Sequence, residues 1–282
     1  MKNLSYLKDI LPKPKTRKTL DAITILSNYC QVNFTTPPEK LKEIIHPRFE
    51  PITILLPGSN IQQAIISAVI FQEKDFHFPL IPYFGNYTFN QVNYRSYCID
   101  KETGLRTIWF LGTIIDHWSI FVPRNVLRFP WHRAKISFET DFQGHDEHNK
   151  YYEKYHMTAK GQYGTANIHV KDLKRKAEDG DFPGFPNKET ALIYLTHSLS
   201  AHFFSRGKKE KLKCLEIWHE PMDPNVGVFD DKAVSYFDLF EKLGLITREQ
   251  KPYNILLQPQ IQYDVYLPPI ESITKNSRYH SP

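Results

Sequence analysis

The feature that most constrains the fold of this chain is a series of segments in which side-chain character alternates with a period of two. The clearest is residues 91–99, whose side chains divide into Val92, Tyr94, Ser96 and Cys98 on one face and Gln91, Asn93, Arg95 and Tyr97 on the other. Successive side chains of a β-strand point to opposite faces, so this period predicts a strand. A chain built from many such segments is restricted to sheet-based folds.

Strand-like segments recur along most of the chain. We expect further strands over residues 62–72, 106–115, 134–142, 151–159, 163–170 and 255–267, and a hairpin that turns at residues 206–207. Residues 62–72 are almost continuously apolar, as a buried helix would be, but their Ile and Val content favours a strand. The predicted fold class is α+β, mainly antiparallel β, as a sheet or a barrel.

Short helices are expected between these strands, over residues 36–46, 122–128, 187–194 and 231–243. The first has the form of a capping box, in which the Thr36 hydroxyl and the Glu39 carboxylate would bind amides at the helix start. The last would be capped by Asp231 and ended by Gly244.

The length and composition allow one sizeable domain. The chain has 282 residues, of which 41% are hydrophobic, enough for a substantial core. Residues 1–20 are basic and aperiodic, so we expect a flexible arm there, and residues 271–282 are expected to form a polar tail. Residues 21–270 are then predicted to form a single domain.

Charge and apolar runs disfavour two classes of partner. The net charge of +5 is spread over short clusters, with no basic stripe that interleaves with aromatic residues, so nucleic-acid binding is not expected. No apolar run approaches the ~20 residues that span a bilayer, so no membrane association is expected. The three cysteines are unpatterned and no signal peptide is evident, which predicts a cytoplasmic protein.

Common catalytic motifs are absent from the sequence, which has no Gly-x-Gly-x-x-Gly, Walker, Gly-x-Ser-x-Gly, Cys-x-x-Cys or His-Glu-x-x-His pattern. We therefore expect no cofactor. Residues 145–148, with Glu153 and His156 beyond them, include metal-ligand residue types, but their polar surroundings are typical of a hairpin loop. No metal site is predicted.

Three blocks, in the right order along the chain, resemble the acetoacetate decarboxylase superfamily. Residues 89–92 are similar to the family's Tyr-Asn-Glu-Val strand, and their extension over 93–97 is closer to the Asn-x-Arg-Thr-Tyr of its YqjF-like branch. Residues 124–134 are similar to the Gly-Arg-Glu-x-x-Gly-x-Pro-Lys-Lys-x-Ala block, with Arg124 retained, and residues 263–269 resemble the last strand of the YqjF-like proteins. The resemblance implies a barrel with a few short helices around one cavity.

The residues that carry out the family's reaction are replaced in this chain. The Schiff-base Lys matches Trp131, the family's Glu matches Gln91, and an Arg of its N-terminal segment falls near Thr35. A Trp cannot form a Schiff base, and a Gln keeps the hydrogen bonding of Glu without exchanging a proton. The resemblance therefore implies the family's cavity without its lysine mechanism.

The candidate binding residues lie on one face of the strand at 91–99. The family's Glu points inward, so the resemblance implies that Gln91, Asn93 and Arg95 look into the barrel; a solvent-exposed face is the alternative. Arg95 would hold a carboxylate bidentately, while Gln91 and Asn93 would bind a carbonyl or hydroxyl. Trp131 and Arg124 complete the predicted substrate-binding set.

His132 is the first candidate for proton transfer, because an unperturbed imidazole titrates near pH ~6.5, and His117 is the second. If residues 131–135 are extended, Trp131 and His132 point to opposite faces, and His132 would sit behind the Trp. The alternative for His132 is a structural, hydrogen-bonded histidine. For His117, packing is the alternative.

The predicted function is an enzyme that acts on a small organic acid or carbonyl compound without covalent lysine catalysis. Lyase, dehydratase, tautomerase or cyclase chemistry is compatible with the candidate residues. One alternative is a non-catalytic small-molecule binding protein that uses Trp131 as an apolar wall, and another is a barrel that Trp131 plugs. A homo-oligomer is compatible with the sequence.

Overall fold

The computed structural model describes residues 21–80, 86–125, 127–144, 150–198 and 200–266, and within them fifteen strands join into one sheet. The strands are β1 (Ala22–Thr36), β2 (Phe49–Pro51), β3 (Thr53–Leu55), β4 (Gln62–His77), β5 (Tyr87–Asp100), β6 (Arg106–Ile115), β7 (Trp131–Arg133), β8 (Lys135–Gln143), β9 (Tyr151–Lys160), β10 (Thr165–Lys176), β11 (Ser200–Ser205), β12 (Lys208–His219), β13 (Asn225–Phe229), β14 (Tyr236–Phe237) and β15 (Asn254–Tyr266). The α-helices are α2 (Pro38–Lys42), α3 (Phe121–Asn125), α4 (Lys188–Thr196) and α5 (Asp238–Lys242), and the 3-10 turns are η1 (Trp118–Ile120) and η2 (Asp179–Asp181).

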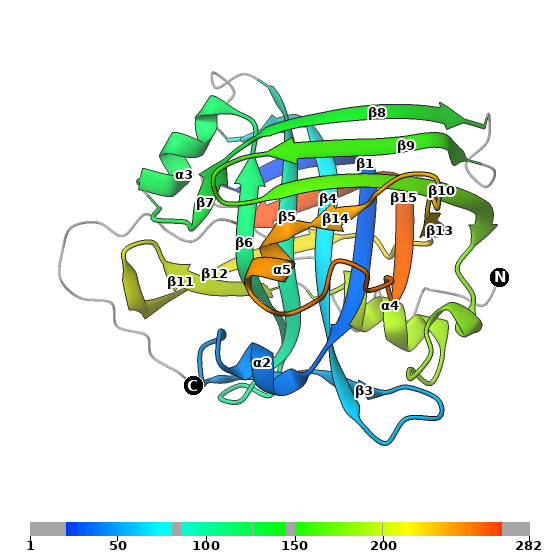
Figure 1. Ribbon diagram of the computed structural model, residues 1–282. Coiled ribbons are helices and arrows are strands. Elements are labelled where there is room, and N and C mark those ends of the chain that lie inside the picture. Colours follow the sequence, from blue (N-terminus) through cyan, green and yellow to red (C-terminus); the bar gives the residue numbers. More distant parts are fainter. Residues whose placement is uncertain (1–20, 81–85, 126, 145–149, 199, 267–282) are drawn as a thin grey trace.

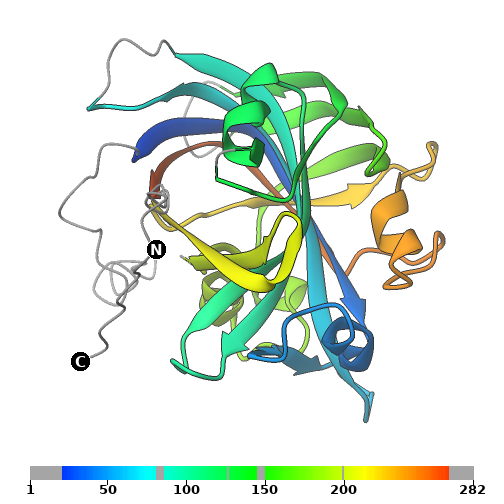
Figure 2. The ribbon, with the colours of Figure 1, turned by 90° about the vertical axis from the view of Figure 1, so that its left-hand side faces the viewer.

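Seven of the strands close into a ring. They follow one another in the order β1, β4, β5, β6, β11, β12 and β15, and β15 pairs again with β1. Neighbours in the ring are antiparallel except for β6 and β11. Figure 2 shows β1 in blue and β15 in red side by side. The predicted mainly antiparallel α+β fold is confirmed.

Strands β8, β9 and β10 form a second layer over the outside of the ring. Figure 1 shows them running across the upright strands β1, β4, β5 and β6. Val92 and Tyr94 of β5 are buried in one apolar core with Met157 of β9 and Ile168 of β10. Side chains alternate along β5, so Val92 and Tyr94 point to the outer layer. The alternate residues Gln91, Asn93 and Arg95 therefore face the inside of the ring.

Helix α4 packs against side chains that face the inside of the ring. Leu192 and Leu195 share an apolar cluster with Ile65 of β4, Tyr97 of β5 and Ile108 of β6. The helix begins as predicted, because the Asn187 side chain accepts a hydrogen bond from the Thr190 amide at 2.8 Å. One end of the ring is therefore lined by helix rather than by strands alone.

The predicted caps of two helices are wrong. The Thr36 hydroxyl donates to the Leu245 carbonyl at 2.7 Å instead of capping a helix, and α2 starts after Pro37. Asp231 caps nothing, because β14 intervenes and α5 starts at Asp238. In both places a bond or pairing to a distant segment replaces the local cap.

The predicted arm at residues 1–20 and the predicted tail at residues 271–282 lie outside the described residues, so both stay predictions, as does the single domain over 21–270. None of the helices in the described part of the chain is long and apolar enough to cross a membrane.

Candidate functional site

The register of the ring strands brings one row of side chains across its inner wall. Gln31 of β1 is opposite Val69 of β4, which is opposite Asn93 of β5, and Asn93 is opposite Thr113 of β6. Thr113 is in turn the partner of Trp131 in the short parallel strand β7. Directly paired residues share a face, so Trp131 faces the inside of the ring together with Asn93.

The predicted binding face of β5 is buried inside this ring. Gln91, Asn93 and Arg95 are 5%, 8% and 5% exposed, so the alternative of a solvent-exposed face is wrong. The physical reason is the second layer, which covers the opposite face of β5 and leaves the polar face to the interior.

Arg95 is a buried cation whose hydrogen-bond partners are all neutral. Its Nε donates to the Tyr97 hydroxyl at 3.3 Å, and its Nη2 donates to Gln31 Oε1 at 3.0 Å and to the Leu195 carbonyl at 2.9 Å. No carboxylate of the described residues forms an ion pair with it. A buried guanidinium without a counter-charge is costly, so this position favours an anion.

A network of neutral side chains holds Arg95 in place. Gln31 Nε2 donates to Asn33 Oδ1 at 2.9 Å and to the Tyr97 hydroxyl at 3.0 Å, while the Tyr29 hydroxyl donates to Gln31 Oε1 at 2.6 Å. Ser67 also binds Asn33 and Tyr97. These bonds fix the acceptors of the guanidinium before any ligand arrives, which preorganises the site.

Gln91 and Asn93 are oriented by a second set of hydrogen bonds. Gln91 Nε2 donates to Asn93 Oδ1 at 2.8 Å, and the Thr113 hydroxyl donates to the same oxygen at 2.9 Å. The Asn93 oxygen is thereby engaged twice, and its amide nitrogen is directed away from these bonds. Gln91 Oε1 is buried and has no partner among the described residues.

Tyr263 of β15 adds a further polar side chain to this inner face, from the opposite wall of the ring. Asn93 and Arg95 keep 8% and 5% of their surface accessible although they face inward, and so does Tyr263 of β15, at 7%. Neither Arg95 Nη1 nor the Tyr263 hydroxyl takes part in a hydrogen bond with any described residue. Both are hydrogen-bond donors, so the inner surface can bind the oxygens of an acid or a carbonyl compound.

Tyr263 lies on His219 of β12, its partner in the sheet. The two rings stack with centroids 4.4 Å apart and planes at 18°. His219 is fully buried, with Nε2 2.9 Å from the Thr196 carbonyl and Nδ1 2.6 Å from the Glu220 carbonyl. Burial lowers the pKa of His219 to about 4, so its ring is neutral at pH 7 and can donate a hydrogen bond to only one of these two carbonyls.

Trp131 forms an apolar wall of the interior. It packs beside Phe129, with ring centroids 4.9 Å apart, and joins the apolar clusters around Phe203 on one side and around Phe89 on the other. The match of Trp131 to the family's lysine stays a prediction.

The structure does not bring His132 into the ring. His132 is the partner of Ile114, which belongs to the core between the layers, and its imidazole stacks on Tyr163 with centroids 3.7 Å apart. Burial, followed by the charges of Arg124 and Arg206, lowers the pKa of His132 to about 4. The predicted catalytic role is therefore not supported, because adjacent residues of β7 point to opposite faces.

Arg124 and His117 are also outside the interior group. Arg124 belongs to α3 and acts electrostatically on His132. His117 follows β6 and stacks at an angle of 24° on Phe89, with ring centroids 5.8 Å apart. Phe89 precedes Gln91 on the same face of β5, so His117 lies at the rim of the ring beyond Gln91.

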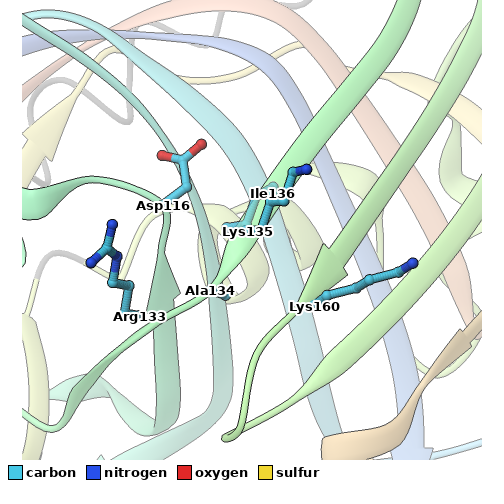
Figure 3. Close-up of a pocket in the computed structure, with 6 residues that line it drawn as sticks. All are labelled: Asp116, Arg133, Ala134, Lys135, Ile136 and Lys160. Carbon is cyan, nitrogen blue, oxygen red and sulfur yellow. The ribbon is translucent and has the colours of Figure 1, made fainter.

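A separate pocket of about 510 Å³ lies on the outer surface. Figure 3 shows its lining residues, which are Asp116, Arg133, Ala134, Lys135, Ile136 and Lys160. The three cations are exposed, and Arg133 and Lys160 lie on opposite sides of it. Inside the ring, the buried Arg95 gives the stronger reason to expect a ligand.

Sequence reasoning missed the contribution of the opposite walls. Tyr29 and Gln31 lie on β1, which was not among the predicted strands, and Tyr263 was noted only as part of a block that resembles the family. The alternation of Tyr29, Gln31 and Asn33 was the available signal. The segment 145–148, weighed as a metal site, lies outside the described residues.

Comparisons with known proteins agree with this architecture. The sequence profile of the family DUF2071, described as "Uncharacterized conserved protein (COG2071)", matches residues 26–259. No curated protein sequence matches the chain.

Solved structures with a similar fold include three enzymes. An acetoacetate decarboxylase-like enzyme from Sphingomonas wittichii RW1 has 9% identity and a TM-score of 0.52, with 87% of this chain and 90% of that chain covered. The enduracididine biosynthesis enzyme MppR complexed with pyruvate has 10% identity and a TM-score of 0.56, with 90% and 91% covered. Acetoacetate decarboxylase from Legionella pneumophila has 12% identity and a TM-score of 0.53, with 94% of each chain covered. At these identities the likeness shows a shared fold.

Proposed function

The chain belongs to the DUF2071 family and has the acetoacetate decarboxylase-like fold, and from this premise we propose that it is an enzyme acting on a small organic acid or carbonyl compound inside the ring, without a Schiff-base lysine. The substrate carboxylate would pair with Arg95. Asn93 and Gln91 would bind a neighbouring carbonyl or hydroxyl, and Trp131 would pack on the apolar part.

The observation that carries this proposal is the uncompensated charge of Arg95. Its guanidinium is buried among a hydroxyl, an amide oxygen and a backbone carbonyl, with no carboxylate partner among the described residues. A carboxylate is the ligand group that a guanidinium binds best, because two parallel N–H donors match its two oxygens. Without such a ligand, the buried guanidinium would lose its hydration without gaining a counter-charge, which costs folding free energy.

The names of the fold relatives agree with this class of ligand. One relative is described in complex with pyruvate and another as an acetoacetate decarboxylase, so the shared fold accommodates short oxo acids in other proteins. In this chain Trp131 stands where the resemblance places the Schiff-base lysine. We therefore expect binding without a covalent bond to the protein.

Binding of short oxo acids tests the proposal directly. Titration calorimetry with pyruvate and with acetoacetate should show binding to the wild type, and Arg95→Gln should weaken it by roughly ten- to hundredfold because the counter-charge is lost. Arg248→Gln is the control, since Arg248 is half-exposed and pairs with Glu241 on the surface. Circular dichroism would confirm that both variants fold. Equal affinities of the wild type and Arg95→Gln would overturn the assignment.

Borohydride reduction tests the absence of a Schiff base. Treatment of the wild type with acetoacetate and borohydride should leave its mass unchanged, whereas a trapped adduct would show that a lysine takes part.

A non-catalytic binding protein is the second candidate, and one observation favours it. His132 faces the outer layer and His117 packs at the rim, so neither predicted proton carrier lies beside Arg95. The two functions separate in one measurement. NMR spectra of a bound oxo acid followed over hours would show conversion or exchange of its C–H protons for an enzyme, and an unchanged ligand for a binding protein.

A further inference from the structure

We propose that Tyr263 donates a hydrogen bond to the carbonyl oxygen of a ligand whose carboxylate is held by Arg95, which makes the site selective for oxo acids over plain carboxylic acids. This inference rests on the proposed function and adds a polarising residue from the opposite wall of the ring. Tyr263 belongs to β15, where it is the partner of Thr24 on β1 and of His219 on β12.

The hydroxyl of Tyr263 has no partner among the described residues, although the side chain is almost enclosed. Neighbouring tyrosines of the interior differ, because Tyr29 donates to Gln31 at 2.6 Å and Tyr97 is 2.7 Å from the Ser67 hydroxyl. Tyr94 also lacks a partner, but it is fully buried in the apolar core between the layers. Tyr263 therefore combines a donor that has no partner among the described residues with a side chain that is not completely buried.

Tyr263 and Arg95 act on the same space. Burial is the first cause that raises the pKa of Tyr263 well above its ordinary value, and the charge of Arg95 opposes that rise, so the two groups lie within electrostatic reach of each other. Tyr29 is a further neighbour of both, since it shares an apolar cluster with Tyr263 and binds the Gln31 oxygen that Arg95 also binds. A ligand on the guanidinium would thus meet the Tyr263 hydroxyl.

Stacking on the buried His219 ring fixes the position of the Tyr263 ring. The neutral His219 ring donates a hydrogen bond to one of the two carbonyls beside it, those of Thr196 and Glu220. A donor that cannot swing away loses little entropy on binding, which strengthens its bond to a ligand. Because the phenol stays protonated at neutral pH, it presents a hydrogen to any oxygen placed opposite.

A fixed donor at this position would also polarise the carbonyl. Negative charge develops on a carbonyl oxygen when a bond at the adjacent carbon is loosened, and a prearranged O–H stabilises that charge. The Tyr263 proton remains on the phenol oxygen, so its contribution is polarisation of the carbonyl and involves no transfer of a proton.

The affinity for an oxo acid relative to its matched plain acid tests this inference. Calorimetry would compare pyruvate with propionate and acetoacetate with butyrate. The wild type should prefer each oxo acid, and Tyr263→Phe should reduce that preference by roughly tenfold. Tyr94→Phe is the matched control: it removes an equally unpaired hydroxyl from the opposite face of the ring wall, and the preference should stay unchanged.

A second readout reports the hydrogen bond itself. The carbonyl carbon of bound pyruvate labelled with carbon-13 should resonate downfield of the free ligand in the wild type and in Tyr94→Phe, and return toward the free value in Tyr263→Phe. An unaltered preference and carbonyl resonance in Tyr263→Phe, with binding that still depends on Arg95, would overturn the role of Tyr263 alone. Failure of the wild type to bind any of the four acids would instead overturn the proposed function.

Discussion

At the scale of single residues, Glu73 is a carboxyl group enclosed within the ring. It faces Leu26 of β1 and Phe89 of β5, is 7% exposed, and its Oε2 has no partner among the described residues. Burial raises its pKa to about 8, and only a hydrogen bond from the Thr24 side chain opposes this. Glu73 is therefore protonated in the folded protein at pH 7.

The pH dependence of stability follows from this pKa. Below pH ~4 the carboxyl is protonated in both the folded and the unfolded state. Between about pH 5 and 8 it ionises in the unfolded chain but not in the folded one, so stability falls as pH rises through this window. Relative to Glu73→Gln, the wild type should lose roughly 3–5 kcal/mol of unfolding free energy between pH 5 and 9.

Urea unfolding of both proteins at pH 5, 7 and 9 would measure this difference. Glu39→Gln is the control, because Glu39 is an exposed residue at the start of α2. A difference in unfolding free energy between the wild type and Glu73→Gln that stays constant from pH 5 to pH 9 would contradict the assignment of a buried, protonated carboxyl.

Residues of the site differ in how far the sequence predicts them. Alternation over 91–99 was enough to place Gln91, Asn93 and Arg95 on one face, and the family resemblance supplied the direction of that face. Gln31 lies in a shorter alternating run, Tyr29, Gln31 and Asn33, because a register shift between Ser27 and Cys30 interrupts the period of β1. Long-range pairing, which a single sequence does not display, decides which residues meet Arg95.

At the scale of elements, strand β6 depends on a glycine. A Cβ on Gly112 would lie 2.2 Å from the Tyr163 ring, which covers the strand there and whose hydroxyl donates to the Leu111 carbonyl at 2.7 Å. His132 stacks on the same ring, with centroids 3.7 Å apart. The absence of a side chain at position 112 thus lets β6, β7 and the start of β10 pack together.

Gly112→Ala should therefore destabilise the protein by roughly 1–3 kcal/mol, because the Tyr163 ring has to move. Thermal or urea unfolding would measure the loss. The matched control is Gly180→Ala, since nothing lies within 4 Å of a Cβ there. In a double-mutant cycle with Tyr163→Ala the penalty of Gly112→Ala should largely disappear; a penalty that persists would place the strain elsewhere.

Elements also show where local signals are overruled. The Asn187 cap was predicted and is present, because its amide partner is three residues away. Asp231 is of a type that often caps helices, yet the helix that follows begins at Asp238. The Asp238 carboxylate accepts a hydrogen bond from the Thr165 amide at 2.5 Å. A contact with β10 sets that helix start, and no local pattern reports it.

At the scale of the whole molecule, all described strands belong to one sheet. Leu257 of β15 illustrates the continuity, because it is fully buried, is opposite Cys30 of the ring, and is also opposite Asn225 of β13, which leads to the outer layer. The ring and the outer layer should therefore unfold together.

Leu257→Ala should lower the unfolding free energy by roughly 2–5 kcal/mol in a single cooperative transition. Tryptophan fluorescence and far-ultraviolet circular dichroism should report the same midpoint in urea, for the wild type and for the variant. Two separate midpoints would show that ring and outer layer fold as distinct units, against the predicted single domain.

The pairing of β1 with β15 has a consequence for biosynthesis. The first described strand of the ring finds one of its neighbours only when β15 has left the ribosome, so the nascent chain carries an unpaired edge until then. Closure waits for β15, and the polar interior with Arg95 exists only after it. A nascent chain lacking β15 would therefore be a client for chaperones before it could hold any ligand.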